Sequence, residues 1–338
     1  MHCVTVAVVG AGLAGLCAAR ELVAHGHKVR VFEKARSVGG RTAWRREGEY
    51  HFDHGAQYFT VRDPRFRRYV TAWCNAGIVS PWKFAVGVAK AGTVTPKPES
   101  VERYVGVPGM NAMAKHLGAE LDIVLNTRVG QVERSSGQWQ LLSDAGVDLG
   151  QYEVVIIATP PAQAVPLLTG APRLAQQAEA VKLAPCWAVM VAFPDPLNIP
   201  FDGVFVHDSS LSWAARNASK PGRPGFECWV LHGTPEWSAR HLEKTSDEVI
   251  AASLAAFFAA TGLKPSQPVL TKAHRWRYSI AEQPLEQGCL WDPEQQLGTC
   301  GDWCQGSRIE GAVLSGLAMA DRVLGLFEPV VSNLQMPK

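Results

Sequence analysis

A glycine pattern near the N-terminus could hold the phosphates of a dinucleotide. It reads Gly10-Ala11-Gly12-Leu13-Ala14-Gly15 and follows the apolar, β-branched run 4–9, which predicts a buried parallel strand. Here Gly10 permits a tight turn, Gly12 leaves space for a pyrophosphate, and Gly15 allows a helix to pack closely on the strand. A helix is expected over 16–25, with its N-terminus toward the phosphates, and Leu13 and Ala14 are included among the expected cofactor contacts.

A carboxylate follows at the distance that ribose binding requires. Residues 28–33 predict a second strand, and Glu33 at its end can accept hydrogen bonds from both hydroxyls of an adenosine ribose. Lys34 comes next and is included among the expected cofactor contacts. Because strand, glycine loop, helix, strand and acid all occur in order, dinucleotide binding is favoured over a glycine-rich structural turn.

A second glycine pair, in Val38-Gly39-Gly40-Arg41, is not expected of a simple NAD domain. This extended pattern resembles the fingerprint of the flavin-dependent amine oxidase superfamily. The resemblance implies that Gly40 and Arg41 run along the pyrophosphate of FAD, where the Arg41 guanidinium neutralises phosphate charge. The alternative is a solvated turn.

The segment Asp53-His54-Gly55-Ala56-Gln57 is similar to one that passes beside the flavin ring in that superfamily. The resemblance implies that Gly55 and Ala56 bring backbone close to the cofactor, and that Gln57 forms a hydrogen bond near the reactive edge of the ring. His51 and His54 have no third ligand nearby, so we expect no metal site.

The cofactor region is expected to close at the C-terminus. Gly301-Asp302 ends a short predicted strand, and helical spacing runs over 309–327. The resemblance assigns Asp302 to the ribityl and phosphate region and places the helix start, at Glu310, Gly311 and Ala312, toward the flavin. The alternative is an ordinary C-terminal αβ unit.

Two further contacts are expected from the middle of the chain. Val129 lies in a small antiparallel layer and could present its backbone to the adenine. Thr159 follows the buried strand predicted over 152–158, which stops at Pro160. A third parallel strand that reaches the cofactor edge is expected of this fold.

The remaining segments predict a substrate region rich in tryptophan. Segments 184–190, 229–232 and 274–278 narrow the resemblance to the renalase family. It implies an aromatic slot for a planar ring at the flavin edge, for which we expect Gln57, Trp187, Trp229, His232 and Trp276.

The renalase resemblance implies an oxidase of isomeric dihydro-NAD(P), with hydride at ring position 2 or 6. Hydride passes to non-covalently bound FAD and then to dioxygen, which yields NAD(P)+ and hydrogen peroxide. A basic cluster, Arg62, Arg65, Arg67 and Arg68, either attracts the diphosphate of this dinucleotide substrate or forms a solvated helix face.

Two alternatives stay open. One is a flavin amine oxidase or desaturase, a class in which a lysine commonly lies near the flavin; Lys272 is a candidate for it. The other is a non-catalytic FAD-binding redox module. Fold does not choose between these functions.

Composition bounds the class of protein. The 338 residues are 47% hydrophobic and carry a net charge of +2, which argues against a nucleic-acid or anionic-membrane partner. Eight scattered cysteines, without an evident secretory signal or membrane span, favour reduced thiols and a cytoplasmic location.

We therefore predict an α/β fold: a Rossmann-type FAD-binding domain interleaved with an α+β substrate domain on a mixed sheet. The FAD-binding domain is expected over 1–60, 109–165 and 290–338. The substrate domain is expected over 61–108 and 166–289. The oligomeric state is not predicted.

Overall fold

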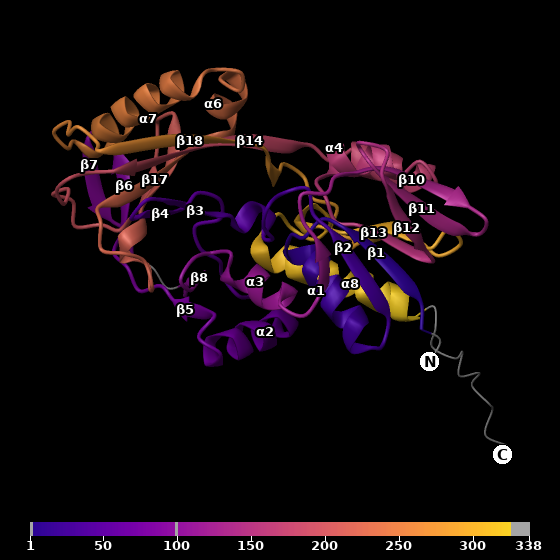
Figure 1. Cartoon of the computed structure of the whole chain (residues 1–338). Helices are drawn as coiled ribbons and strands as arrows, with labels where there is room; N and C mark the ends of the chain where they lie inside the picture. The colour runs from indigo at the N-terminus through magenta and orange to yellow at the C-terminus, as the bar shows by residue number, and fades with distance from the viewer. Residues whose placement is uncertain (1–2, 99–100, 326–338) are drawn as a thin grey trace, which may run out of the picture.

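The computed structural model describes residues 3–98 and 101–325 (Figure 1). Its first large sheet, as far as the described residues show, has the strand order β19 (Leu290–Asp292), β20 (Leu297–Thr299), β13 (Val154–Ile157), β1 (Thr5–Val9), β2 (Lys28–Phe32) and β9 (Asp122–Val124). All neighbouring pairs are parallel except β19 with β20. The predicted Rossmann-type fold class is confirmed.

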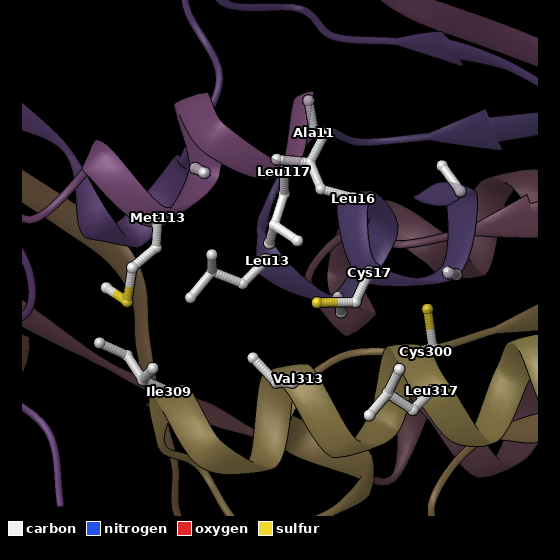
Figure 2. Packing of buried hydrophobic residues seen from close by; sticks show 14 of the residues in the cluster. Ala11, Leu13, Leu16, Cys17, Met113, Leu117, Cys300, Ile309, Val313 and Leu317 are labelled. Atoms are coloured by element: carbon white, nitrogen blue, oxygen red, sulfur yellow. The ribbon is translucent and has the colours of Figure 1, made fainter. Parts of the chain in front are cut away.

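Helices cover one face of this sheet. They are α1 (Leu13–Ala24), α3 (Ala112–Gly118) and α8 (Ile309–Gly325). Figure 2 shows apolar side chains of the three helices meeting in one cluster, among them Leu13, Cys17, Met113, Val313 and Leu317. The expected helices over 16–25 and from residue 309 are thus present, and residues 326–327 of the second lie outside the described residues.

The opposite face packs on a small three-stranded antiparallel sheet. Its strands are β10 (Val129–Ser135), β11 (Gln138–Ser143) and β12 (Asp148–Tyr152), with α4 (Pro161–Ala164) and α5 (Pro172–Glu179) beside them. Trp139 of β11 is buried against Val155 and Ile157 of β13 in one apolar cluster. The expected antiparallel layer around Val129 is therefore present.

The second large sheet is mixed. Its order in the described residues is β18 (Leu270–Ala281), β14 (Leu183–Ala192), β17 (Cys228–Gly233), β16 (Leu211–Arg216), β15 (Gly203–Val206), β6 (Val86–Lys90) and β7 (Thr93–Pro96). The helices α6 (Pro235–Arg240) and α7 (Ser246–Thr261) cover its outer face (Figure 1). The capping box predicted for α7 forms between Thr245 and Glu248.

Several smaller elements belong to neither large sheet. They are β3 (Trp44–Glu47), β4 (Tyr50–Asp53), α2 (Pro64–Asn75), β5 (Val79–Pro81) and β8 (Tyr104–Gly106). Short 3₁₀ turns occur at Gly40–Thr42, Val165–Leu167, Asn217–Ser219 and Asp302–Cys304.

The chain crosses between the sheets more than once. The first sheet draws strands from 5–32, 122–157 and 290–299, and the second from 86–96 and 183–281. This alternation agrees with two interleaved domains, whose exact boundaries stay a prediction. Helices α2 and α5 pack in the apolar clusters of the first sheet, although they fall in segments assigned to the substrate domain.

No helix within the described part of the chain is long and apolar enough to cross a membrane.

Contact between α1 and α8 depends on a residue without a side chain. A Cβ at Gly316 would lie 2.2 Å from the backbone oxygen of Ala14, so Gly316→Ala must push the helices apart. We expect a loss of about 2 kcal/mol or more in the free energy of unfolding, measured by denaturant titration. Gly325→Ala in the same helix meets no atom within 4 Å and is the matched control. Equal stability of both variants would contradict this packing.

Candidate active site

A cavity of about 1080 Å³ runs from the glycine loop after β1 to the inner face of the second sheet. Its wall comes from distant parts of the chain: residues 9–14, 32–42, 55–58, 127–130, 158–167, 275–280 and 301–312 contribute to it. The N-terminal and C-terminal motifs of the sequence therefore meet around one space.

The glycine loop has the geometry of a phosphate cradle. Gly10 has φ of +110°, and a Cβ there would lie 2.7 Å from the oxygen of Ala158. A Cβ at Gly12 would meet nothing within 4 Å, so its space opens to the cavity. A Cβ at Gly15 would lie 2.1 Å from the oxygen of Gly10. Gly15 thus serves helix packing and does not line the cavity, whereas Leu13 and Ala14 do.

The ribose end is built around Glu33, which is buried and lines the cavity. Its two carboxylate oxygens accept hydrogen bonds from the backbone N–H groups of Ala11 and Ala35, each at 2.8 Å. Each oxygen keeps a further lone pair for a sugar hydroxyl. Lys34 also lines the cavity, donates to Gln163 at 2.9 Å, and has a pKa lowered mainly by burial.

An ion pair joins the two ends of the chain at the cavity wall. The Arg41 guanidinium donates to both carboxylate oxygens of Asp302, at 2.5 and 3.0 Å, and to the Ser279 oxygen at 2.8 Å. Its charge is therefore shared with Asp302, which the sequence assigned separately to the ribityl and phosphate region. Gly40, beside Arg41, has φ of +53° and lies across from Gly12.

Two contacts from the middle of the chain reach the cavity. Val129 and Thr159 both line it, and the contact of Val129 with the adenine stays a prediction. The Thr159 hydroxyl is buried and has no hydrogen-bond partner in the described chain. Buried hydroxyls are almost always hydrogen-bonded, so this one is a candidate for a contact with a bound ligand.

The start of α8 differs in part from the prediction. Ala312 lines the cavity, together with Arg308 and Ile309, but Glu310 and Gly311 do not. The Glu310 carboxylate turns away to accept hydrogen bonds from the backbone of Arg62 and Asp63, at 2.7 and 2.8 Å. A Cβ at Gly311 would lie 3.2 Å from the backbone of Gly306, so that glycine serves loop packing.

The wall opposite the C-terminal helix is the segment Gly55, Ala56 and Gln57, all of which line the cavity. A Cβ at Gly55 would lie 2.1 Å from the Arg41 oxygen, so close backbone approach requires glycine there. The Gln57 amide donates to the backbone oxygens of Asp53 and Gly55. Both side-chain donors are thus used within the protein, and the expected hydrogen bond of Gln57 near the flavin edge stays a prediction.

Two tryptophans predicted to line the substrate site face away from the cavity. Trp187 is buried beside α6 and Trp229 beside α7, both in the outer core of the second sheet, and neither lines the cavity. Side chains alternate between the faces of a strand, so a neighbouring residue, Cys186, faces the cavity instead. Trp276 does line the cavity, and Trp213 joins it. One of the three predicted tryptophans therefore lines the cavity, and the aromatic slot at the flavin edge stays a prediction.

His232 also lines the cavity, and its ring lies 3.3 Å from the backbone oxygen of His54. The Trp276 indole donates to the same oxygen at 2.9 Å. Burial lowers the pKa of His54 to about 3 and that of His232 to about 4. Both imidazoles are therefore neutral at pH 7, and this part of the wall carries no histidine charge.

A buried lysine next to the cavity was missed. Lys220 donates to the Gln57 side-chain oxygen at 3.0 Å, whereas Lys272, the lysine considered from the sequence, is exposed and does not line the cavity. Lys220 lies in a loop 163 residues from Gln57, and no sequence pattern signals their contact.

The basic cluster Arg62, Arg65, Arg67 and Arg68 does not line the cavity. Arg65 pairs with Asp321 of α8 on the surface, at 2.7 Å. The solvated helix face, rather than a diphosphate site, describes these residues.

The geometry agrees with comparisons to known proteins. Residues 8–73 match the family model of an NAD(P)-binding Rossmann-like domain. Residues 88–324, more than half of the chain, match that of flavin containing amine oxidoreductases. The chain belongs to the flavin containing amine oxidoreductase family. Members of this family are FAD-dependent oxidoreductases.

The chain is similar to 4,4'-diapophytoene desaturase from Staphylococcus haemolyticus (strain JCSC1435), with 47% identity over 58 residues. That match spans 17% of this chain and only 12% of the desaturase.

Solved structures share the fold. Cyclohexylamine oxidase from Brevibacterium oxydans IH-35A has a TM-score of 0.77 at 15% identity, covering 97% of this chain and 100% of that chain. Putrescine oxidase bound to putrescine has a TM-score of 0.72 at 16% identity, covering 96% and 99%. At this identity the likeness concerns the fold alone.

The residues present fit FAD, the cofactor of the family. Gly12 would leave room for the pyrophosphate, Glu33 would bind the adenosine ribose, and Thr159 offers an unpaired hydroxyl. Cys300 and Cys304, which flank the Gly301-Asp302 unit, are buried and do not line the cavity. Within the described residues, no group of three His, Cys, Asp or Glu side chains could hold a metal ion.

Gly12→Ala separates cofactor binding from folding. Because the added methyl would meet no protein atom within 4 Å, we expect the free energy of unfolding of the apoprotein to stay unchanged while FAD affinity falls at least tenfold. Flavin fluorescence titration measures the affinity. Gly10→Ala, which meets the Ala158 backbone, should reduce stability as well. Unchanged FAD affinity in Gly12→Ala would contradict the cradle.

The neutral histidines predict a pH dependence of stability. Their pKa values are lowered in the folded state, so their contribution is complete above about pH 6.5 and is lost as pH falls toward 4. Between pH 6.5 and 5, His54→Gln should reduce the slope of unfolding free energy by up to about 1.4 kcal/mol per pH unit. The exposed His25→Gln is the control. Equal slopes in all three proteins would refute the buried neutral state.

Proposed function

We propose that the protein is an FAD-dependent oxidase of isomeric dihydro-NAD(P), with hydride at ring position 2 or 6. When bound, FAD accepts the hydride, and dioxygen then accepts the two electrons, giving NAD(P)+ and hydrogen peroxide. The free cysteines agree with the expected cytoplasmic location, and the sequence resemblance to renalases supports the substrate class.

The observation that carries this proposal is the charge around the cavity. Its lining includes two carboxylates, Glu33 and Asp302, and both lie at the cofactor motifs. Three basic lining residues, Lys34, Arg41 and Arg128, also lie at the cofactor motifs, which leaves Arg275, Arg277 and Arg308 for a substrate. A basic rim attracts a phosphorylated substrate and disfavours a protonated amine. Arg275 and Arg277 share Glu243 on the surface, so only part of their charge is offset.

Aromatic side chains line the part of the cavity toward the second sheet. Tyr58, Phe205, Trp213 and Trp276 contribute aromatic walls there. The Trp213 ring lies edge-on to Phe205, at 4.7 Å between centroids, and to Tyr58 at 5.6 Å. Aromatic walls position a flat ring and exclude water.

The chemistry asks little acid–base work of these side chains. Hydride leaves a ring carbon without removal of a proton from carbon, so a general base is not required. The neutral His232 and the internally hydrogen-bonded Gln57 agree with this, because they form part of the wall without adding a charged base. Catalysis then rests on positioning of the substrate ring.

Anaerobic mixing tests the proposal against its alternatives. We expect 2- or 6-dihydro-NAD(P) to bleach the oxidised flavin absorbance in a single turnover, and a panel of primary and secondary amines to leave it unchanged. Ordinary 4-dihydro-NAD(P) is the matched control for dinucleotide binding. Bleaching by amines alone would assign an amine oxidase, and bound FAD that no donor reduces would assign a redox module; either result overturns the proposal.

A further inference from the structure

A lysine ammonium is enclosed behind the Gln57 wall. The side chain of Lys220 is 0% exposed, and its nitrogen donates to Asp53 at 3.2 Å, Gln57 at 3.0 Å and Asn217 at 3.2 Å. It also lies 5.3 Å from the centroid of the Trp82 ring. Because Lys220 does not line the cavity, it can act on a ligand there only through its neighbours.

The cluster around this ammonium carries more positive than negative charge. The Asp53 carboxylate pairs with Lys220 and also with Arg223, whose guanidinium donates at 2.7 and 3.2 Å and is equally enclosed. Arg223 alone would neutralise Asp53. Burial lowers the pKa of Lys220 to about 8 while Asp53 raises it, so at pH 7 the ammonium leaves a surplus charge of one.

Stability does not explain a second buried cation. Replacing a buried charge by an apolar side chain of similar volume is often neutral or stabilising, provided no partner is left unpaired. Asp53 would keep Arg223 and the Met110 N–H, which donates at 2.9 Å.

Lys220 interacts with two residues of the cavity wall, which lie on different elements. Gln57 accepts the ammonium hydrogen bond while its own donors hold the backbone of Asp53 and Gly55, so Lys220 completes the fixation of this side chain. His232 of β17 has its pKa lowered first by burial and also by the charge of Lys220. The field of the ammonium therefore reaches the wall from which both residues face the cofactor space.

We propose that Lys220 is a positioning residue for bound FAD: it fixes Gln57 against the cofactor and places an uncompensated positive charge behind that wall. Reduction adds negative charge to the flavin, and a buried cation nearby favours the more negative form. Lys220 thus makes the bound cofactor a better electron acceptor. The inference rests on FAD binding and not on the proposed substrate.

The midpoint potential of bound FAD tests this role. Reductive titration of the holoprotein should show that Lys220→Met shifts the oxidised-to-reduced equilibrium at least tenfold toward the oxidised form, about 30 mV for a two-electron couple. Lys220→Arg keeps the charge and should restore most of the shift. Lys244→Met removes a surface ammonium paired with Glu248 and is the matched control, with no shift expected.

A second variant keeps the test decisive if Lys220→Met does not retain FAD. Gln57→Glu places a carboxylate against the ammonium with almost no change in volume, and should lower the potential in the same direction. An unchanged potential in a folded, flavin-bound Lys220→Met or Gln57→Glu protein would overturn the inference. Because no substrate is used, this failure is distinct from failure of the proposed oxidase activity.

Discussion

The buried carboxylate of Asp53 is the constraint on which the site depends. It ends β4, accepts the backbone N–H of Met110 at 2.9 Å, and pairs with Arg223 at 2.7 Å. Burial alone would raise its pKa, but Lys220 and Arg223 outweigh this and lower it. A 0% exposed anion must keep its partners, so segments from three parts of the chain are held together beneath Gly55 and Gln57.

Contacts between residues that are far apart in the sequence close the cavity. Arg41 meets Asp302 across 261 residues, and Trp276 reaches the backbone of His54 across 222. The two ends of the chain therefore supply the cofactor cradle, while the inner face of the second sheet supplies the remaining wall. Such an arrangement requires the interleaved path of the chain through both sheets.

The sequence predicted the parts that local patterns encode. The glycine loop, the acid at Glu33 and the α7 capping box each depend on short spacing, and they hold in the structure. The sequence did not predict which face of a strand lines the cavity. Trp187 lies one residue from Cys186, which lines the cavity, and a run that is apolar on both faces does not reveal which face is which. Lys220 could not be found, because only tertiary contacts bring it to Gln57.

We propose that this cavity aligns a dihydropyridine ring for direct hydride transfer to FAD. The most direct measurement is the primary kinetic isotope effect on anaerobic flavin reduction, using dihydro-NAD(P) isomers deuterated at the reduced ring carbon. If hydride is transferred directly, flavin reduction should be clearly slower when deuterium replaces the transferred hydrogen at position 2 or 6. Flavin reduction without an isotope effect would contradict direct hydride transfer. The absence of flavin reduction by either isomer would contradict it as well.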